Sequence, residues 1–208
     1  MATSIDNLTV SGTLRIKEDG VSTQTRATIL RQDANAVFPI NLTSLRVWDA
    51  YQTSLPGTAA TDDLALVGGT FGTAPPTVSA GDLKALGATT RYARFQMVLP
   101  ECYDPAETIT LSIYAGMVTT ISDTTCTLDV QCYKLDKVTG IGSDLCATAA
   151  TTINSVVLAA IPFTITSSGL AAGDTFDVRI AIACNDAATG TAVTPTIAAI
   201  DLLCDIKG

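Results

Sequence analysis

Alternation of apolar and polar residues with a period of two runs through several stretches of this chain. In residues 126–133 every second residue is apolar, and the residues between them are Thr, Asp, Gln and Tyr. Residues 176–184 and 200–206 repeat the pattern, and each again places a cysteine in the apolar set. Because successive side chains of a strand point to opposite faces, this pattern is typical of antiparallel strands with one buried face. It predicts that four cysteines are buried: Cys126, Cys132, Cys184 and Cys204.

Predicted strands follow one another regularly from residue 90 onward, with turn residues such as Gly, Pro, Asn and Ser between them. Further strands are expected at 6–17, 45–51 and 64–67, and one or two helical turns at 79–86. This spacing favours an all-β fold, an antiparallel β-sandwich of jelly-roll or Greek-key type with an extended N-terminal arm; a closed barrel is the alternative. The six regular strands are expected over 91–99, 108–118, 125–134, 156–166, 175–184 and 195–206.

The N-terminal part of the chain differs from the rest. Residues 21–44 are polar and without sustained periodicity, and such a segment needs a partner surface to become ordered. We therefore divide the chain into an N-terminal strand and arm, 1–44, and a β-sandwich domain, 45–208. The strand before the arm has an apolar face suited to edge-strand addition on a neighbouring subunit. Its interface candidates are Leu8, Val10, Leu14 and Ile16.

Charge and hydropathy limit the possible partners. The formal net charge of −8 argues against a nucleic-acid partner, which would require a basic surface. Residues 1–46 hold five Lys/Arg and four acids, whereas residues 47–208 hold seven and sixteen, an imbalance that permits head-to-tail contact between copies. No apolar run reaches the ~18–20 residues that cross a bilayer, so we expect no membrane partner. The N-terminus lacks the basic and apolar regions of a secretory signal, so we expect a chain that stays in the cytoplasm where it is made.

The cysteines are interpreted as reduced core residues, because free cysteine behaves as a small hydrophobe and the six show no C-x-x-C spacing. Cys126 and Cys132 lie roughly 20 Å apart along one strand, at ~3.3 Å per residue, and cannot pair with each other. A cross-strand bridge between Cys184 and Cys204 is the expected exception. Zinc is not expected, because zinc sites normally use closely paired ligands.

Catalytic chemistry finds little support in the sequence. The chain has no histidine, which excludes histidine-dependent triads and proton relays. It has no G-x-S-x-G or Walker-type motif, and its few glutamates are interpreted as loop residues rather than as a glycosidase pair. We therefore expect no enzyme activity and no cofactor. Binding of Ca²⁺ at a loop rim stays open for Asp104, Glu107 and Asp123, since hard cations favour clustered oxygen ligands.

Four aromatic residues are candidates for a contact surface. Trp48 and Tyr51 flank Asp49 and form either an exposed binding patch or a cover over the core edge. Tyr92 and Tyr133 fall on the polar parity of their strands, so they should face solvent or a partner. Tyrosine is enriched at interfaces, which makes both residues reasonable contact candidates.

Several segments resemble structural proteins of tailed bacteriophages: 47–52, 55–60, 62–64, 69–73, 90–95 and 142–150. The resemblance covers most of residues 45–208 and contains no catalytic motif, so it carries over no site residues. It implies a virion component, such as a capsid decoration (cement) protein or another head-associated protein. Such a protein would form homo-oligomers, contact a major capsid protein and be assembled into the virion in the host cytoplasm.

The alternative function is a binding module for carbohydrate or a cell surface, carried on a virion fibre or spike; an enzyme is a third possibility. Exposed aromatic side chains that line one groove would favour the binding module. A cluster of buried carboxylates with shifted pKa values would favour an enzyme. A flat apolar patch, together with an arm that reaches a neighbour, would favour the shell protein.

Overall fold

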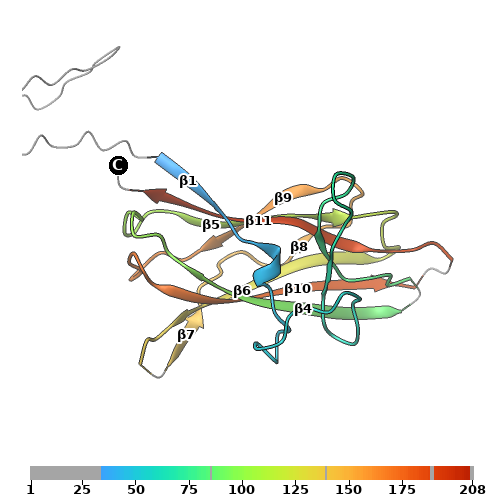
Figure 1. Ribbon diagram of the computed structural model, residues 1–208, viewed down its shortest axis with the longest axis horizontal. Coiled ribbons are helices and arrows are strands. Elements are labelled where there is room, and N and C mark those ends of the chain that lie inside the picture. The colour runs from blue at the N-terminus through green and yellow to red at the C-terminus, as the bar shows by residue number, and fades with distance from the viewer. Residues whose placement is uncertain (1–33, 85, 139, 188–189, 207–208) are drawn as a thin grey trace, which may run out of the picture.

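Two antiparallel sheets pack face to face in the computed structural model, which describes residues 34–206 except 85, 139, 188 and 189. The arrangement confirms the all-β sandwich predicted from the alternation (Figure 1). The predicted strand at 6–17, with Leu8, Val10, Leu14 and Ile16, lies outside the described residues.

The six-stranded sheet is built around its long C-terminal strand. Its order is β2-β3-β11-β5-β9. β1 and β3 share one edge of β11: β3 pairs with its N-terminal half and β1 with its C-terminal half. Its strands are β1 (Ala34–Pro39), β2 (Ala65–Val67), β3 (Thr77–Ser79), β5 (Ile109–Met117), β9 (Ala159–Ile165) and β11 (Pro195–Ile206).

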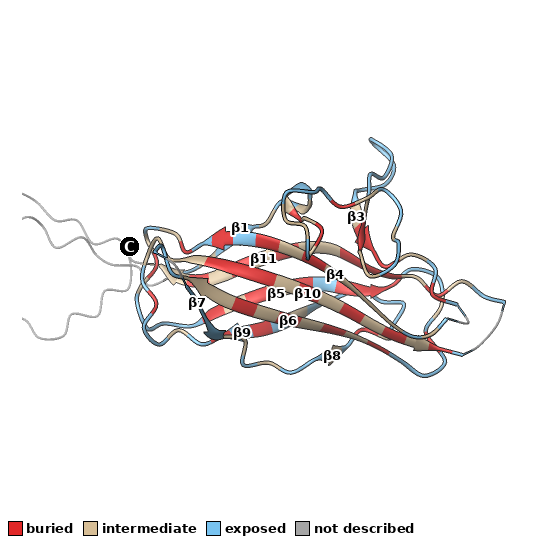
Figure 2. Ribbon diagram, turned by 90° about the horizontal axis from the view of Figure 1, so that it is seen from below, coloured by how far each residue is buried: buried red, intermediate tan, exposed pale blue. Residues whose placement is uncertain are grey.

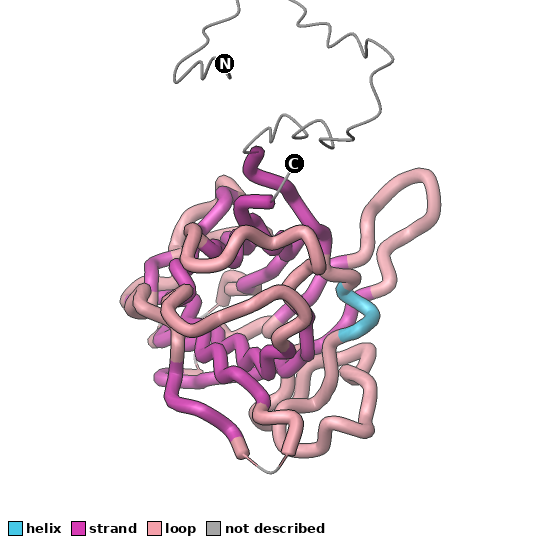
Figure 3. The backbone as a smooth tube through the Cα atoms, turned by 90° about the vertical axis from the view of Figure 1, so that its left-hand side faces the viewer, coloured by secondary structure: helices cyan, strands magenta, loops and turns pink. Residues whose placement is uncertain are grey.

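The five-stranded sheet has the order β4-β10-β6-β7, and β8 pairs with the free part of β6. Seen along the long axis, the two sheets form two layers, with the short 3-10 helix η1 (Leu42–Ser44) at the side (Figure 3). The strands of this sheet are β4 (Gly87–Val98), β6 (Thr125–Leu135), β7 (Ile141–Asp144), β8 (Thr151–Thr152) and β10 (Thr175–Asp186).

Consecutive long strands alternate between the two sheets, as in a jelly roll: β4, β6 and β10 lie in one sheet, and β5, β9 and β11 in the other. Buried and less buried residues alternate along these strands (Figure 2). In β10 the inward set is the one predicted: Phe176, Val178, Ile180, Ile182 and Cys184 are all buried.

The four cysteines predicted to be buried are buried, and all six thiols are free. The interpretation as reduced cysteines is confirmed, and the exception considered for Cys184 and Cys204 does not occur: both thiols are free, and their strands β10 and β11 are not paired. The register partner of Cys184 is instead Cys126, on β6. Burial raises the pKa of the Cys204 thiol to about 11.

Two short elements differ from the prediction. Residues 45–51 form no strand, because the chain turns back on itself. Arg46 makes isolated bridges to Arg94 and to Ser54, and the N–H of Val47 donates to the carbonyl of Thr53 (3.0 Å). No helical turn forms at 79–86 in the part that is described; Ser79 instead ends β3, and its hydroxyl accepts a hydrogen bond from the N–H of Gly81.

The segment before the domain boundary expected at residue 45 includes one strand of the sandwich. β1 pairs with β11 from Ala34 opposite Ile206 to Pro39 opposite Asp201. Residues 34–40 of the predicted arm therefore pair with the six-stranded sheet, and Leu42 packs against the core.

Candidate binding site on the five-stranded sheet

The outer face of the five-stranded sheet carries an ordered set of polar and aromatic side chains. The register places residues of β4, β10 and β6 side by side in rows that cross the three strands. The rows are Tyr92–Ala181–Asp129, Arg94–Arg179–Gln131 and Gln96–Asp177–Tyr133.

The segment after η1 folds over the β4 side of this face and brings further aromatic rings to it. A backbone bridge between Arg46 and Arg94 fixes its position, with N–H···O distances of 2.8 and 3.0 Å. The indole N–H of Trp48 donates to Asp62 Oδ2 (2.9 Å), and its ring lies 5.0 Å from that of Tyr92 at an angle of 45°. Trp48 is therefore held in one orientation above the sheet.

Between this segment and β7 lies a hollow of about 460 Å³. Its floor is formed by the outward side chains of β10, with β4 and β6 on either side of that strand. The strand β7 projects from the edge of the sheet at the other side (Figure 1). The hollow is lined by Trp48, Asp49, Arg94, Gln131, Tyr133, Ile141, Asp177 and Arg179.

An ion pair forms part of the floor. The Arg94 guanidinium binds both carboxylate oxygens of Asp177, with Nε to Oδ1 at 2.7 Å and Nη2 to Oδ2. This hydrogen-bonded carboxylate raises the pKa of Arg94, although burial opposes the shift. The guanidinium also lies 5.1 Å from the centre of the Tyr51 ring. The pair is thus held from two sides, and its charges balance each other.

A second guanidinium, that of Arg179, lies against two aromatic rings that also contact each other. Its central carbon is 5.4 Å from the centre of the Trp48 ring and 4.9 Å from that of Tyr92. One N–H donates to Gln131 Oε1. These contacts fix the plane of a partly buried cation within the hollow.

Acidic side chains gather near Trp48. Burial raises the pKa of Asp63, and the neighbouring charges of Asp62 and Asp49 raise it further. The Oδ1 atom of Asp63 is buried without a hydrogen-bond partner. The described residues nevertheless contain no group of three ligating side chains that could hold a metal ion.

The structure places all four predicted aromatic contact residues at this one site. Trp48 and Tyr133 line the hollow, Tyr92 packs against Trp48, and Tyr51 stacks on Arg94. Sequence reasoning did not select the polar partners: Arg94, Gln131, Asp177 and Arg179. Their outward parity was visible in the alternation, and the same parity that selected Tyr92 and Tyr133 could have selected them.

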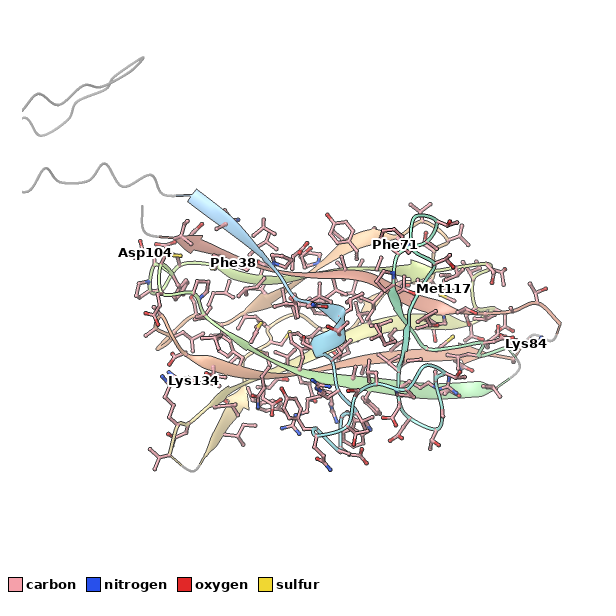
Figure 4. All side chains as sticks on the ribbon, viewed as in Figure 1. Phe38, Phe71, Lys84, Asp104, Met117 and Lys134 are labelled. Carbon is pink, nitrogen blue, oxygen red and sulfur yellow. The ribbon has the colours of Figure 1, made fainter. Side chains whose placement is uncertain are left out.

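The other residues considered for ligand chemistry lie apart. Asp104 donates its backbone N–H to the carbonyl of Asp205 at one end of the sandwich (Figure 4). Asp123, in contrast, accepts a hydrogen bond from the N–H of Ala187, beyond the end of β10. Asp104 and Asp123 therefore do not share one loop rim. None of the helical segments in the described part is long and apolar enough to cross a membrane.

No protein-family model and no curated protein sequence matches the chain. Among solved structures it is similar to the xylan-binding module CBM15, with 13% identity over 82% of this chain and 97% of that one, at a TM-score of 0.45. It is also similar to the CBM22-1 xylan-binding domain of Paenibacillus barcinonensis Xyn10C, with 9% identity over 70% and 82%, at a TM-score of 0.39. A structure of the infectious bursal disease virus Gx strain matches 93% of this chain and 46% of its own with 14% identity, at a TM-score of 0.25. Since all three TM-scores lie below 0.5, we infer function from the site itself.

Proposed function

We propose that this protein is a carbohydrate-binding module, and that its ligand lies in the hollow on the outer face of the five-stranded sheet. The observation that carries the proposal is the convergence of Trp48 and Tyr133 with Arg179 and Gln131 around one hollow. Small-molecule sites typically combine aromatic surface with a few fixed polar groups. A sugar ring presents both kinds of surface, because its C–H face is apolar and its hydroxyls donate and accept hydrogen bonds.

The rigidity of the site supports binding without a large rearrangement. Trp48 is tethered through Asp62, Arg94 through Asp177, and Arg179 through Gln131. Because these side chains are already ordered, less conformational entropy is lost when a ligand binds. The ring of Tyr133 on β6 then provides a surface for stacking.

The carboxylates of the hollow favour binding over hydrolysis. Glycoside hydrolysis needs two carboxyl groups on either side of the scissile bond. Of the two that line the hollow, Asp177 is bound at both oxygens by Arg94. We therefore propose a non-enzymatic role.

The resemblance to tailed-phage structural proteins suggests where such a module would act. On a virion fibre or spike, many copies would bind a host surface glycan together, and this multivalency would raise a modest single-site affinity. The virion location, and assembly in the host cytoplasm, stay predictions that electron microscopy of the native particle would test.

A second candidate, a capsid decoration protein, is supported by a different surface. Exposed apolar residues occupy one end of the six-stranded sheet, where residues 155–158 lie against Gly116. Contiguous apolar patches commonly mark contact sites, here with other copies or with a major capsid protein. The residues are Tyr114, Val118, Ile121, Val156, Val157 and Leu158. Light scattering of the protein and of a Val157→Asp variant tests the contact between copies: a multimer that the substitution dissociates supports it, and a monomer in both cases opposes it.

Binding to an array of immobilised glycans tests the main proposal. Tyr133→Ala should weaken binding by at least about tenfold, because a stacking surface is lost. Phe71→Ala is the control, since Phe71 is a fully exposed aromatic residue that lies outside both the hollow and the apolar contact surface. Equal binding by both variants would place the ligand elsewhere. A protein that binds none of the glycans would overturn the proposal.

A further inference from the structure

The floor of the hollow contains two guanidinium groups side by side. Arg94 on β4 and Arg179 on β10 are direct register partners. Like charges directly opposite each other on neighbouring strands repel. Asp177 binds Arg94 through both of its oxygens, so this carboxylate balances one of the two cations. The charge of the other cation, Arg179, is not balanced by Asp177.

Among the described residues, no carboxylate lies within salt-bridge distance of Arg179. Its neighbours are the amide oxygen of Gln131 and the rings of Trp48 and Tyr92. A guanidinium has five N–H donors, and one of them is used by Gln131. The remaining donors lie in a plane that the two rings fix.

The acidic residue that also lines the hollow does not balance this charge. Asp49 is exposed to solvent and forms no ion pair with Arg179. The nearby carboxylate of Asp62 accepts the hydrogen bond of the Trp48 indole N–H and is likewise not paired with Arg179.

We propose that Arg179 binds the carboxylate of an acidic saccharide, a polymer or chain end that contains a uronic acid. This inference deepens the proposed carbohydrate binding and rests on it. The planar fork of a guanidinium matches the two oxygens of a carboxylate and forms paired, charge-assisted hydrogen bonds. The incoming anion also balances the charge of Arg179, which a neutral sugar does not. Stacking on Tyr133 then orients the ring that carries the carboxylate.

Pairs of polymers that differ in charge alone test this inference. Polygalacturonate, alginate and hyaluronan are each compared with a methyl-esterified form, in which the carboxylates are neutral. Fluorescence of Trp48, the single tryptophan of the chain, reports binding to the intact protein. We expect at least one acidic polymer to bind about tenfold or more tightly than its ester, and to bind more weakly as salt is added.

Two variants with the same change in net charge separate a specific contact from general electrostatics. Arg179→Gln should reduce binding of the acidic polymer by about tenfold or more and leave binding of the ester nearly unchanged. Lys84→Gln removes a cation that does not line the hollow, at the other end of the molecule from Lys134 (Figure 4), and should have little effect. A Tyr133→Ala variant should weaken binding of both polymers.

The possible failures can be told apart. If acid and ester bind equally well, and Arg179→Gln weakens both by the same factor, the site binds sugars but Arg179 does not select a carboxylate. If Lys84→Gln matches Arg179→Gln, the preference for acid comes from long-range charge and the inference is wrong. If no polymer of either kind binds and the glycan array is also negative, the proposed carbohydrate binding fails together with it.

Discussion

Replacing either member of the Arg94–Asp177 ion pair should lower the free energy of unfolding, and replacing Arg94 should lower it more than replacing Asp177. The Asp177 side chain is 6% exposed, whereas that of Arg94 is 33% exposed. Replacing Arg94 with methionine keeps the apolar stem of the side chain but leaves a buried carboxylate without its cation. Breaking a buried pair in this way costs about 3–5 kcal/mol. Because water reaches a third of Arg94, we expect a loss near the lower end, about 3 kcal/mol.

The reverse substitution should cost less. In Asp177→Leu the guanidinium of Arg94 keeps its contact with the Tyr51 ring and turns its donors toward solvent. We expect a loss of about 1–2 kcal/mol, close to that of ordinary charge-assisted hydrogen bonds. The double variant Arg94→Met/Asp177→Leu contains no buried charge at this position, so it should be more stable than Arg94→Met alone.

Urea unfolding, followed by circular dichroism, measures all three differences in the free energy of unfolding. The four proteins form a double-mutant cycle, in which the coupling energy is the departure from additivity. An equal cost for both single variants, or a double variant whose loss is the sum of the two, would refute the idea of a buried carboxylate that depends on Arg94.

Three further predictions concern the core, the thiols and the loop before β4. Ile180→Asp places an uncompensated charge between the sheets and should lower the free energy of unfolding by several kcal/mol. Gln96→Ala, on the outer face, should change it by no more than ~0.5 kcal/mol. Similar urea midpoints for the two variants would contradict the inward orientation of Ile180. Titration with a thiol reagent should modify the two half-buried cysteines first and the four buried ones only after denaturation; rapid modification of all six in the native protein would oppose the burial. The backbone N–H of Val193, by its hydrogen bond, lowers the pKa of Asp82 below the ordinary value of 3.8, so this carboxylate stabilises the fold above that pH and ceases to do so as the pH falls through its lowered pKa. Asp82→Ala should therefore reduce the melting temperature at pH 7, and this deficit should shrink as the pH falls below 3.8; a deficit that does not change with pH would point to another cause.

Much of the fold was predictable because it depends on local alternation. A period of two identifies a half-buried strand wherever it occurs, and Ile180 and Arg179 fall on opposite faces of β10 for that reason. The same reasoning failed for the segment around Trp48, because Leu45 and Val47 are buried as in a strand although the backbone between them forms only isolated bridges, from Arg46 to Arg94 and to Ser54.

The site was less predictable than the fold, because it depends on pairings between distant parts of the chain. Parity places Asp177 on the outer face, but only the structure shows that Arg94 lies beside it and that the residue is buried. The register between β4 and β10 also places Arg94 opposite Arg179. No local sequence pattern contains that register, although the register decides which charged side chains lie next to each other.

The alternation of long strands between the two sheets has a consequence for how the chain folds as it is synthesised. β4 pairs with β10, so Val98 has no partner until Thr175 has been synthesised. β5 likewise has no partner until β9, and then β11, have been made. The apolar faces of β4 and β5 therefore stay uncovered while most of the sequence is still being made, a delay that is typical of folds with distant pairings. Among the described strands, β2 pairs with β3, and β6 pairs with β7 and β8, so these strands find partners nearby in the sequence. Both sheets are therefore completed only when β10 and β11 have been synthesised, and a chain that ends before β10 leaves β4 without a partner strand and β5 paired with β9 alone.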